Sequence, residues 1–387
     1  MSRKLPYDRT LVVLVFVLLC FGLVMVFSAS GIVSQRLHDS FTWVFGRQLA
    51  FVAFGFFLML LAARIDYHWY ARPAVVFSAL AVTLVLLAAV FAFPAYHGAR
   101  RWVVILGIRF QPSELAKLAM VIFTSYYLIW AGQRFHAFWR GLVPYLLVLG
   151  VNVGMIVLEP DLGTPICILS TAGFLIYLGG LRYRYIMVAL LLAVPAFYFL
   201  VLNVTYRRNR LLAFLDPEKD PLGVGYHIRQ SLIAVGSGGW SGVGYAQGGQ
   251  KQFFLPEPHN DFIFAVIGEE LGLIGTLFTL VLFTLVFLKG VKIALRSDSL
   301  FGTYLGLGIV AMITLQALLN MSVVVSLLPT KGIPLPLISV GGTSVLVTLA
   351  AIGILLNISR HGRKDPAGPA LLGEVSGGAD HTVETHE

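Results

Sequence analysis

The sequence predicts an all-α polytopic membrane protein with ten transmembrane helices and one large extracytoplasmic loop. Hydrophobic residues make up 58% of the 387 residues and charged residues only 12%, and the mean hydropathy is +0.83. A soluble domain carries roughly 25% charged residues, so these charges are too few to cover a water-facing surface. The composition therefore excludes a water-soluble globular enzyme, and it also excludes an intrinsically disordered chain.

Ten apolar runs are long enough to cross the roughly 30 Å of hydrocarbon in a bilayer. The first follows a basic start and ends in small residues, as a secretory signal does. It is too long for such a signal and many runs follow it, so we expect an uncleaved first helix. The runs are continuous rather than alternating, which argues against a β-barrel. They lie at 11–27, 47–64, 74–94, 115–132, 142–158, 162–180, 184–204, 262–290, 301–325 and 342–359.

The distribution of Lys and Arg predicts that both termini are cytoplasmic. With that orientation the inner segments hold 15 Lys and Arg residues, and the short outer segments hold six. The net charge of +9 then reflects anchoring at anionic lipid and not binding to nucleic acid. We divide the chain into a cytoplasmic segment at 1–10, a ten-helix membrane domain at 11–363 with a large extracytoplasmic loop at 205–261, and a disordered cytoplasmic tail at 364–387.

Polar residues concentrate at the predicted outer ends of the helices, where burial is costly unless the residue has a role. Glu114 and Lys117 are three residues apart at a helix start, so they share a face and can form an ion pair. Glu159 and Asp161 flank a proline in a tight outer turn. Asp161 can cap the following helix or contact a substrate. Any chemistry is therefore expected at the outer leaflet.

The loop at 205–261 is the densest polar feature. Its segment 236–249 has glycine at seven of fourteen positions, which suits close approach of backbone amides to a ligand, tight turns or a flexible loop. It has neither of the glycine spacings that mark nucleotide-binding loops. Arg207, Arg208 and Arg210 can anchor lipid headgroups or bind substrate phosphates, and Lys251 is a further candidate for substrate contact.

The loop ends at Asp261, directly before an apolar helix. This residue can cap the helix or act as a base at the membrane boundary. Glu257 and His259 lie close by in sequence and are candidate metal ligands, but their spacing is weakly specific. The position of Asp261 therefore leaves a structural and a catalytic interpretation open.

Two carboxylates lie about two turns deeper in the same helix, at Glu269 and Glu270. Buried carboxylates need partners, and Lys117 or Lys331 are candidates for that pairing. We expect a structural role for both glutamates. Asn320 lies inside the ninth run, and we expect it to bond a neighbouring helix and not a substrate.

A carboxylate beside cations at a membrane face suits sugar transfer from a lipid pyrophosphate. The leaving group is a stable anion, so cations can stabilise its charge. The remaining need is a base that takes the proton from the attacking hydroxyl, and Asp261 fits that role. A lipid flippase requires the same head recognition without the base, so the composition leaves both functions open.

A series of short motifs occurs in order between residues 11 and 360, and their number and order argue against chance. They include Gly98-Ala99-Arg100-Arg101-Trp102, Gln111-Pro112-Ser113-Glu114-Leu115, Glu159-Pro160-Asp161-Leu162-Gly163, Gln230-Ser231 with Gly236-Ser237-Gly238-Gly239, Phe254-Leu255-Pro256-Glu257 with His259, Asp261-Phe262-Ile263-Phe264-Ala265, Glu269-Glu270-Leu271-Gly272, and Leu335-Pro336 through Ser339 with Gly341-Gly342. Together they resemble the SEDS family (shape, elongation, division and sporulation proteins). The segment from Leu328 to Gly332 resembles the division branch more than the elongation branch, while Val340 stands where the family commonly carries Tyr.

The resemblance implies a SEDS-type bundle that polymerises lipid II into β-1,4 glycan strands during septal cell-wall synthesis. It places the essential aspartate of the family at Asp261, the expected catalytic residue. Structural or ion-pair roles are expected for Asp161, Glu269 and Glu270. The expected substrate-binding residues are Arg101, Trp102, Glu114, Lys117, Arg207, Arg208, Arg210, Lys251, His259 and Lys331.

The resemblance also implies binding partners and a location. The partners are lipid II, glycan linked to undecaprenyl pyrophosphate, a cognate class B penicillin-binding protein and other divisome proteins, with no nucleic acid. The location is the bacterial inner membrane at the division septum. No cofactor is assigned, although a divalent cation (Mg²⁺ or Mn²⁺) stays an open alternative. A lipid II flippase, an elongation-type polymerase and a scaffold for septal proteins are the alternative functions.

Overall fold

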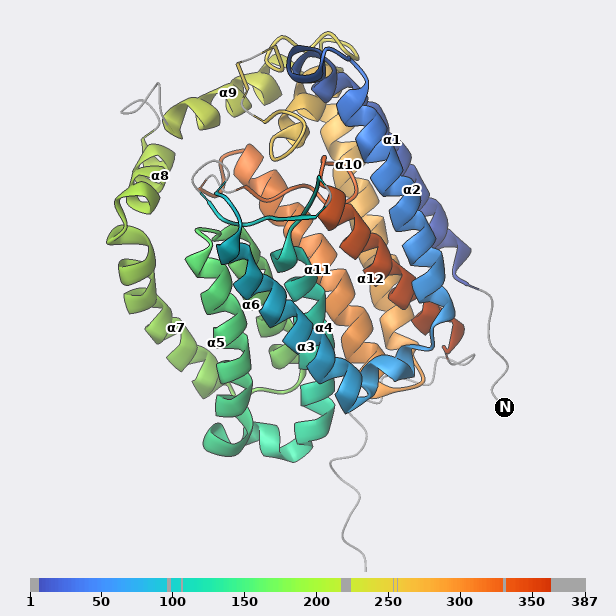
Figure 1. Ribbon diagram of the computed structural model, residues 1–387, viewed down its shortest axis with the longest axis vertical. Coiled ribbons are helices and arrows are strands. Elements are labelled where there is room, and N and C mark those ends of the chain that lie inside the picture. Colours follow the sequence, from blue (N-terminus) through green and yellow to red (C-terminus); the bar gives the residue numbers. More distant parts are fainter. Residues whose placement is uncertain are drawn as a thin grey trace, which may run out of the picture.

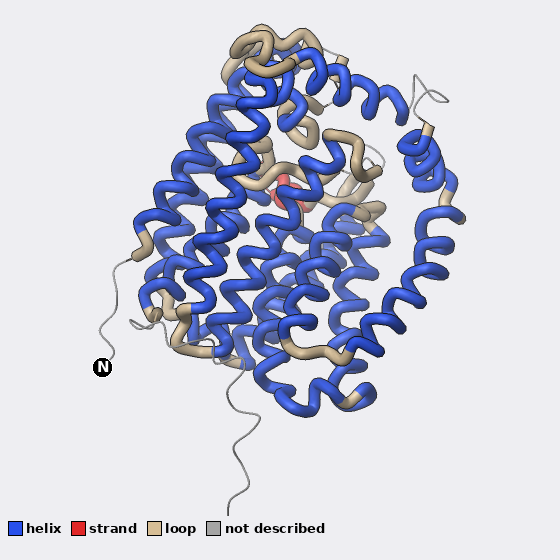
Figure 2. The backbone as a smooth tube through the Cα atoms, turned by 180° about the vertical axis from the view of Figure 1, so that it is seen from behind, coloured by secondary structure: helices blue, strands red, loops and turns tan. Residues whose placement is uncertain are grey.

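The computed structural model describes residues 7–95, 99–105, 107–216, 224–252, 254–255, 257–329 and 332–362. The expected substrate-binding residue Lys331, most of the predicted segment 1–10 and the predicted tail at 364–387 lie outside these ranges. Figure 2 shows that the described chain is helical apart from connecting loops and two short strands. The predicted all-α class is therefore confirmed.

Each of the ten predicted apolar runs is helical in the described part of the chain. Within the described residues, eight helices are long and apolar enough to cross a membrane, and a shorter apolar helix lies at Gly163–Leu178. A further helix, at Tyr183–Phe197, continues as a π-helix at Tyr198–Leu202. The main helices are α1 (Arg9–His38), α2 (Trp43–Arg64), α3 (Pro73–Ala89), α4 (Pro112–Ala131), α5 (Val143–Leu158), α6 (Gly163–Leu178), α7 (Tyr183–Phe197), α8 (Thr205–Leu215), α9 (Val224–Ser237), α10 (Ile263–Leu295), α11 (Leu300–Val324) and α12 (Gly342–Arg360).

Short helical turns connect several of these helices. They are η1 (Tyr67–Ala71), η2 (Val90–Ala92), η3 (Gly132–His136), η4 (Phe138–Leu142) and η5 (Tyr198–Leu202). Consecutive long helices run up and down the bundle in Figure 1. The two ends of the described chain meet at one end of the bundle, where Arg360 donates a hydrogen bond of 3.0 Å to the hydroxyl of Tyr7. An even number of membrane crossings produces this arrangement.

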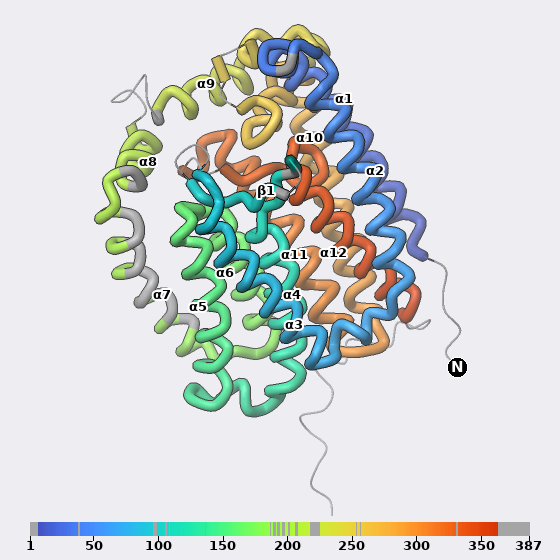
Figure 3. Tube along the Cα trace, in the orientation of Figure 1, coloured from blue at the N-terminus to red at the C-terminus, as the bar shows by residue number. Residues whose placement is uncertain are grey.

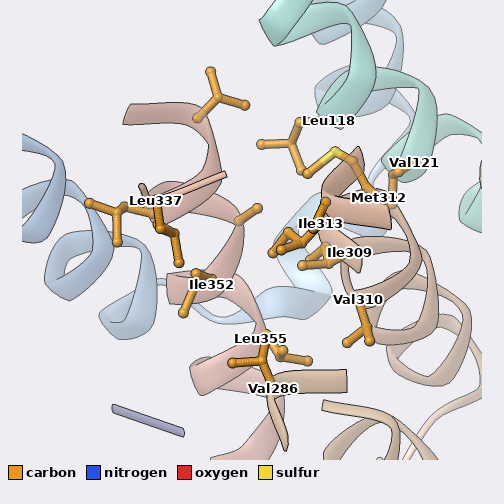
Figure 4. Packing of buried hydrophobic residues seen from close by; sticks show 14 of the residues in the cluster. Leu118, Val121, Val286, Ile309, Val310, Met312, Ile313, Leu337, Ile352 and Leu355 are labelled. Atoms are coloured by element: carbon orange, nitrogen blue, oxygen red, sulfur yellow. The ribbon is translucent and has the colours of Figure 1, made fainter. Parts of the chain in front are cut away.

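Helix α11 lies at the centre of the bundle, in contact with α4, α6, α10 and α12. Small residues on α11 allow its neighbours to approach closely. A Cβ atom added at Gly306 would lie 2.8 Å from the Ala294 side chain on α10, and one at Gly308 would lie 2.7 Å from Val121 on α4. Figure 4 shows buried hydrophobic side chains of α4, α10, α11 and α12 packed against one another. Close packing through small residues is the usual way in which helices associate within lipid.

The described part of the predicted loop at 205–261 contains two helices, α8 and α9, which the glycine content of its second half did not indicate. With α7 they form an arch beside and above the bundle (Figures 1 and 3). Helix α9 contacts α10, and the Ser231 hydroxyl donates a hydrogen bond of 2.7 Å to the Val324 oxygen of α11. Leu, Ala and Arg, which are strong helix formers, occur in both helices, which agrees with helices preceding the glycine-rich segment.

A two-stranded antiparallel sheet lies in the connection between α3 and α4. Its strands are β1 (Val103–Ile105) and β2 (Ile108–Phe110), paired with Val103 opposite Phe110. This hairpin joins other connections at what we call the loop-rich end of the bundle. That end consists of the segments 99–105, 107–111, 159–162, 238–252, 257–262 and 332–341. The connections η1 and η3–η4 lie at the opposite end (Figure 1).

Candidate active site

Asp261 lies at the loop-rich end, two residues before the start of α10. Its backbone oxygen accepts a hydrogen bond of 2.8 Å from the side-chain amide of Asn320 on α11. The same amide nitrogen donates at 2.7 Å to the backbone oxygen of Ile333. Asn320 therefore joins the start of α10 to the 332–341 segment, as expected for a residue that bonds neighbouring parts of the bundle.

The carboxylate of Asp261 does not cap α10. The N-cap position is Phe262, and no side chain accepts a hydrogen bond there. The carboxylate faces Gly332, since a Cβ atom added to that glycine would lie 2.9 Å from Oδ2 of Asp261. Within the described residues the Asp261 side chain forms no hydrogen bond or ion pair. Its oxygens are therefore available to accept a proton.

Burial raises the pKa of Asp261 to about 7, and the neighbouring carboxylates of Glu257 and Asp161 add to the rise. The guanidinium groups of Arg101 and Arg210 act in the opposite direction and lower this pKa. A catalytic base works best when its pKa lies near the working pH. Near pH 7, Asp261 can both accept and release a proton.

Arg101 connects the hairpin segment to the turn between α5 and α6. Its Nε donates a hydrogen bond of 3.4 Å to the backbone oxygen of Glu159, and a terminal nitrogen donates to the backbone oxygen of Pro160. These bonds leave the positive charge of Arg101 close enough to Asp261 to influence its titration. Arg101 is thus placed at the site, as expected, with a structural contact of its own.

Asp161 caps the start of α6. Its Oδ1 accepts a hydrogen bond of 2.9 Å from the backbone N–H of Gly163, and its Oδ2 accepts one of 2.8 Å from the Thr164 hydroxyl. Of the two interpretations open at the sequence level, the geometry supports capping. The cap holds a negative charge at the loop-rich end, where it contributes to the raised pKa of Asp261.

Glu159 is fully buried, and neither of its carboxylate oxygens has a hydrogen-bond partner in the described residues. Burial raises the pKa of Glu159 to about 8; Asp161 adds to the rise and Arg101 opposes it. At neutral pH this side chain is therefore mostly protonated. Glu159 was recognised in the sequence as part of the turn, but its burial beside the site was not predictable from its neighbours in the chain.

Glu114 and Lys117 form the ion pair that their spacing allows, with Oε1 and Nζ 2.9 Å apart and both side chains buried. The Lys117 ammonium also donates to Oε1 of Gln316 on α11 at 2.5 Å. The side-chain amide of Gln316 in turn donates a hydrogen bond of 2.9 Å to the backbone oxygen of Pro334. The pair therefore joins α4 to α11 and, through Gln316, to the 332–341 segment beside Asp261.

Gln316 is the participant that sequence reasoning missed. It lies four residues before Asn320, so the two amides share one face of α11. Both contact the segment at 332–341. Two amide side chains one turn apart inside an apolar run are a signal that could have identified this face as the one that supports the site.

The partner of Glu270 is Lys251, which corrects the expectation that Lys117 or Lys331 provides the pairing. The Lys251 ammonium lies 2.5 Å from Oε1 of Glu270, with both side chains buried. The hydroxyl of Ser28 on α1 donates to the same carboxylate at 2.6 Å. Lys251 lies in the 238–252 segment, nineteen residues before Glu270 in the chain. The position of Glu270 along α10 therefore did not identify Lys251 as its partner.

Glu269 binds backbone amides instead of a cation. Its Oε1 accepts hydrogen bonds of 2.7 Å from the N–H of Gly249 and 2.9 Å from the N–H of Gln250. The structural roles expected for Glu269 and Glu270 therefore agree with the contacts that they make. Both fix the glycine-rich segment to α10.

The glycine-rich segment repairs a break in α10. Gly272 has a φ of +63° inside the helix, which interrupts the ladder of backbone hydrogen bonds. The N–H of Val243 donates a hydrogen bond of 3.0 Å to the freed backbone oxygen of Glu269. The N–H of Leu273 donates one of 2.9 Å to the backbone oxygen of Gly239. Glycine is required there because the two backbones approach so closely. The segment thus satisfies backbone groups of a membrane helix, and its amides are not arranged around a ligand site.

The remaining expected substrate-binding residues lie on α8 and directly before β1. Arg208 and Arg210 lie on α8, Arg208 exposed and Arg210 half-buried, and the Arg207 side chain is outside the described part of the structure. Trp102 is half-buried directly before β1. Arg210 is a member of the arginine cluster that lowers the pKa of Asp261.

His259 contacts the 332–341 segment through its backbone and lies near Glu257 through its ring. Its backbone oxygen accepts a hydrogen bond of 2.9 Å from the N–H of Val340. Its Nε2 lies 3.9 Å from Oε2 of Glu257. Burial lowers the pKa of the His259 imidazole, and Glu257 opposes the shift. The described residues contain no group of three His, Cys, Asp or Glu side chains placed to hold a metal ion, so Glu257 and His259 have no third protein ligand among them.

The fold and the site together define a multi-pass membrane protein in which Asp261 and several buried charged side chains gather at one end of the helical bundle. The chain belongs to the FtsW/RodA/SpoVE family of cell cycle proteins, whose sequence model matches residues 9–364. This is the SEDS family that the sequence motifs indicated.

Relatives within the family match along almost their whole length. The chain is 42% identical to the probable peptidoglycan glycosyltransferase FtsW of Geobacter metallireducens, over 93% of this chain and 96% of the relative. It is 38% identical to the stage V sporulation protein E of Bacillus subtilis, over 94% of this chain and 99% of that protein.

Solved structures are similar in fold. A chain from a peptidoglycan synthase complex, described as coordinating polymerization and crosslinking, superposes with a TM-score of 0.77 and 29% identity, over 93% of this chain and 100% of that one. The rod shape determining protein RodA of Thermus thermophilus superposes with a TM-score of 0.68 and 26% identity, over 93% of this chain and 99% of that one. The bundle described above is therefore shared with these proteins.

Proposed function

We infer that this chain is a peptidoglycan glycosyltransferase of the FtsW type, which polymerises lipid II into glycan strands. The family and the full-length similarity to proteins of that description support this function. The observation that carries the mechanism is Asp261, an acid with a pKa of about 7 that has no side-chain partner among the described residues and lies near Arg101 and Arg210. This arrangement places a base and two cations together at one end of the bundle.

In the proposed reaction Asp261 acts as general base. Its carboxylate takes the proton from the 4-hydroxyl of the acceptor sugar on lipid II. The hydroxyl oxygen attacks the anomeric carbon of the growing chain and forms a β-1,4 bond. The bond from that carbon to the pyrophosphate oxygen breaks, and undecaprenyl pyrophosphate leaves with the electron pair. No acid is needed on the leaving-group side, because the pyrophosphate is already a stable anion.

Cations complete the proposed site. Arg208 and Arg210 on α8, with Arg207 and Lys331, are proposed to contact the pyrophosphates of the two lipid substrates, since guanidinium groups match phosphate oxygens well. Arg101, Trp102 and His259 are proposed to border the sugar head. Charge reversal at Arg208 or Lys331 is expected to weaken lipid II binding. The described residues offer no three-ligand metal site, so we derive no step through a divalent cation.

For three charged residues we propose support of the site in place of direct substrate contact. Glu114 and Lys117 are paired with each other, and Lys251 is paired with Glu270. A buried ammonium that already contacts a carboxylate and a second oxygen has little capacity left for a ligand. These pairs hold α4, α10 and α11 in the arrangement that places Asp261.

We further propose the orientation and the partner. The loop-rich end with the loop at 205–261 faces the extracytoplasmic side, and the segment 1–10 and the tail at 364–387 are cytoplasmic, in the cytoplasmic membrane at the division septum. The structural similarity to a chain of a peptidoglycan synthase complex supports a cognate class B penicillin-binding protein as partner, together with other divisome proteins.

The test is polymerisation of labelled lipid II by the purified protein with its partner. Asp261→Asn is expected to abolish glycan formation while leaving lipid II binding measurable. Asp39→Asn is the matched control, because Asp39 is exposed directly after α1. Polymer formation at the wild-type rate by Asp261→Asn would eliminate the proposed base. Transbilayer movement of lipid II in liposomes without any polymer would instead establish the flippase alternative.

A further inference from the structure

A basic cavity lies at the end of the bundle opposite to Asp261. Helix α4 stops at Ala131, and the chain then folds through η3 and η4 before α5 begins. Between these turns and the end of α4 is a cavity of about 380 Å³, lined by Trp130, Ala131, Arg134, Ala137 and Arg140. The proposed glycosyl transfer makes no use of this cavity.

The turn that carries the two arginines is fixed by buried aromatic packing. The Phe135 side chain is buried, with its ring 6.2 Å from that of Tyr127 and 6.3 Å from that of Tyr145. The Tyr127 hydroxyl donates a hydrogen bond of 2.7 Å to the backbone oxygen of Gly141. With Phe135 directed inward, its neighbour Arg134 lines the cavity together with Arg140. The arginines are therefore held on a built turn.

Neither guanidinium has a partner among the residues that the structure describes. Within the described residues Arg134 and Arg140 form no hydrogen bond or ion pair through their side chains, and both are exposed. The sequence contains no Asp or Glu between Glu114 and Glu159, and Glu114, at the far end of α4, is paired with Lys117, so no acid of the turn or of the adjoining helix ends compensates them. Two uncompensated positive charges that line one cavity attract an anion, and guanidinium groups suit phosphate oxygens best.

The position of the cavity corresponds to the level of lipid headgroups. Helix α4 has 20 residues, which corresponds to about 30 Å, the thickness of the hydrocarbon region. Trp130 and Trp139 near its end are 61% and 77% exposed, as expected for tryptophans at a membrane interface. A phosphate bound between the two arginines would therefore lie where lipid phosphates lie.

We propose that Arg134, Arg140 and Trp130 form a binding site for the phosphate of an anionic phospholipid. The two guanidinium groups bind the phosphate diester, and the Trp130 ring lies against the glycerol backbone and the first methylene groups. A soluble phosphate would meet the same guanidinium groups, but it would gain nothing from the exposed tryptophan. With the orientation proposed above, the lipid belongs to the cytoplasmic leaflet, which in general carries anionic headgroups.

The test uses the full-length protein in detergent and native mass spectrometry with defined lipids. Wild type is expected to retain phosphatidylglycerol at concentrations at which phosphatidylcholine is lost. Arg134→Gln with Arg140→Gln is expected to reduce the apparent affinity for phosphatidylglycerol about tenfold or more. The matched control is Arg182→Gln with Arg184→Gln. These residues follow α6, do not line the cavity, and Arg184 already lies over the ring of Tyr185.

Three results would overturn the proposal. An equal loss of affinity in the cavity variant and the control would indicate a general charge effect. Equal retention of the two lipids by wild type would remove the selectivity for an anion. Full displacement of the lipid by millimolar inorganic phosphate would identify a soluble phosphate as the ligand. If the glutamine variant fails to fold, Arg134→Lys with Arg140→Lys keeps both charges, and retained selectivity in that variant supports the site.

Discussion

The side-chain amide of Asn320 holds the backbone oxygen of Asp261 at 2.8 Å. This contact fixes the position of the aspartate through its main chain, while its carboxylate accepts no hydrogen bond from the residues that the structure describes. The second bond of the amide, to the backbone of Ile333, brings the 332–341 segment to the same place. A base can thus be positioned firmly and still exchange a proton with a substrate.

Asn320→Ala is expected to lower kcat about tenfold to a hundredfold, because small displacements of a catalytic group have effects of that size. The KM for lipid II should change little, since Asn320 does not contact the substrate in the proposed reaction. Steady-state polymerisation rates over a range of lipid II concentrations provide the measurement.

The matched control for Asn320 is Asn152→Ala. Asn152 is also buried in the bundle, but its amide donates only to Val148 on its own helix. We expect this variant to polymerise lipid II at close to the wild-type rate. Equal losses of kcat in the two variants would show that the effect of Asn320 is a general loss of stability.

The pH dependence of polymerisation should report the titration of Asp261. A general base must be unprotonated, so the rate is expected to rise with pH through a midpoint near the pKa of about 7. The Glu257 carboxylate contributes to the rise in this pKa, so Glu257→Gln should lower it and move the rising limb to lower pH. Measurement of kcat/KM against pH distinguishes the variants. An unchanged limb in Glu257→Gln would mean that the profile belongs to another group.

The sequence was sufficient for the membrane architecture but not for the contacts within it. The apolar runs at 47–64 and 301–325 correspond to α2 and α11 because lipid imposes a continuous apolar surface on any spanning helix. The Glu114–Lys117 pair was also predictable, since helix geometry places residues three apart on one face. Local spacing and composition determine both features.

Contacts between distant segments were beyond the sequence. Lys251 pairs with Glu270 only because the glycine-rich segment folds back onto α10, and nothing in its own surroundings distinguishes it from a substrate-binding lysine. The break at Gly272 was equally hidden, since glycine is common within membrane helices. Such features depend on how a loop packs, and a single sequence records neither the packing nor the backbone angle.

The pairing of Lys251 predicts a loss of stability rather than a loss of substrate affinity. Lys251→Met leaves the Glu270 carboxylate buried without its cation, which typically costs about 3–5 kcal/mol. The double variant Lys251→Met with Glu270→Gln removes both charges and should recover much of that loss. Unfolding in detergent and lipid II binding by the folded fraction measure the two effects. Weaker lipid II binding at wild-type stability would instead show that Lys251 contacts the substrate.

The repair of α10 by the glycine-rich segment predicts a sharp contrast between two glycines of that segment. Gly242 has a φ of +79°, and a Cβ atom there would overlap the backbone oxygen of Glu270. Gly242→Ala should therefore displace the segment, expose unpaired backbone groups at the break and destabilise the protein by about 3 kcal/mol or more. Gly236 has no neighbouring atom within 4 Å of an added Cβ and lies in α9, so Gly236→Ala should be neutral or slightly stabilising. Equal unfolding temperatures for the two variants would contradict a supporting role for the segment, because only Gly242 lies against the broken helix.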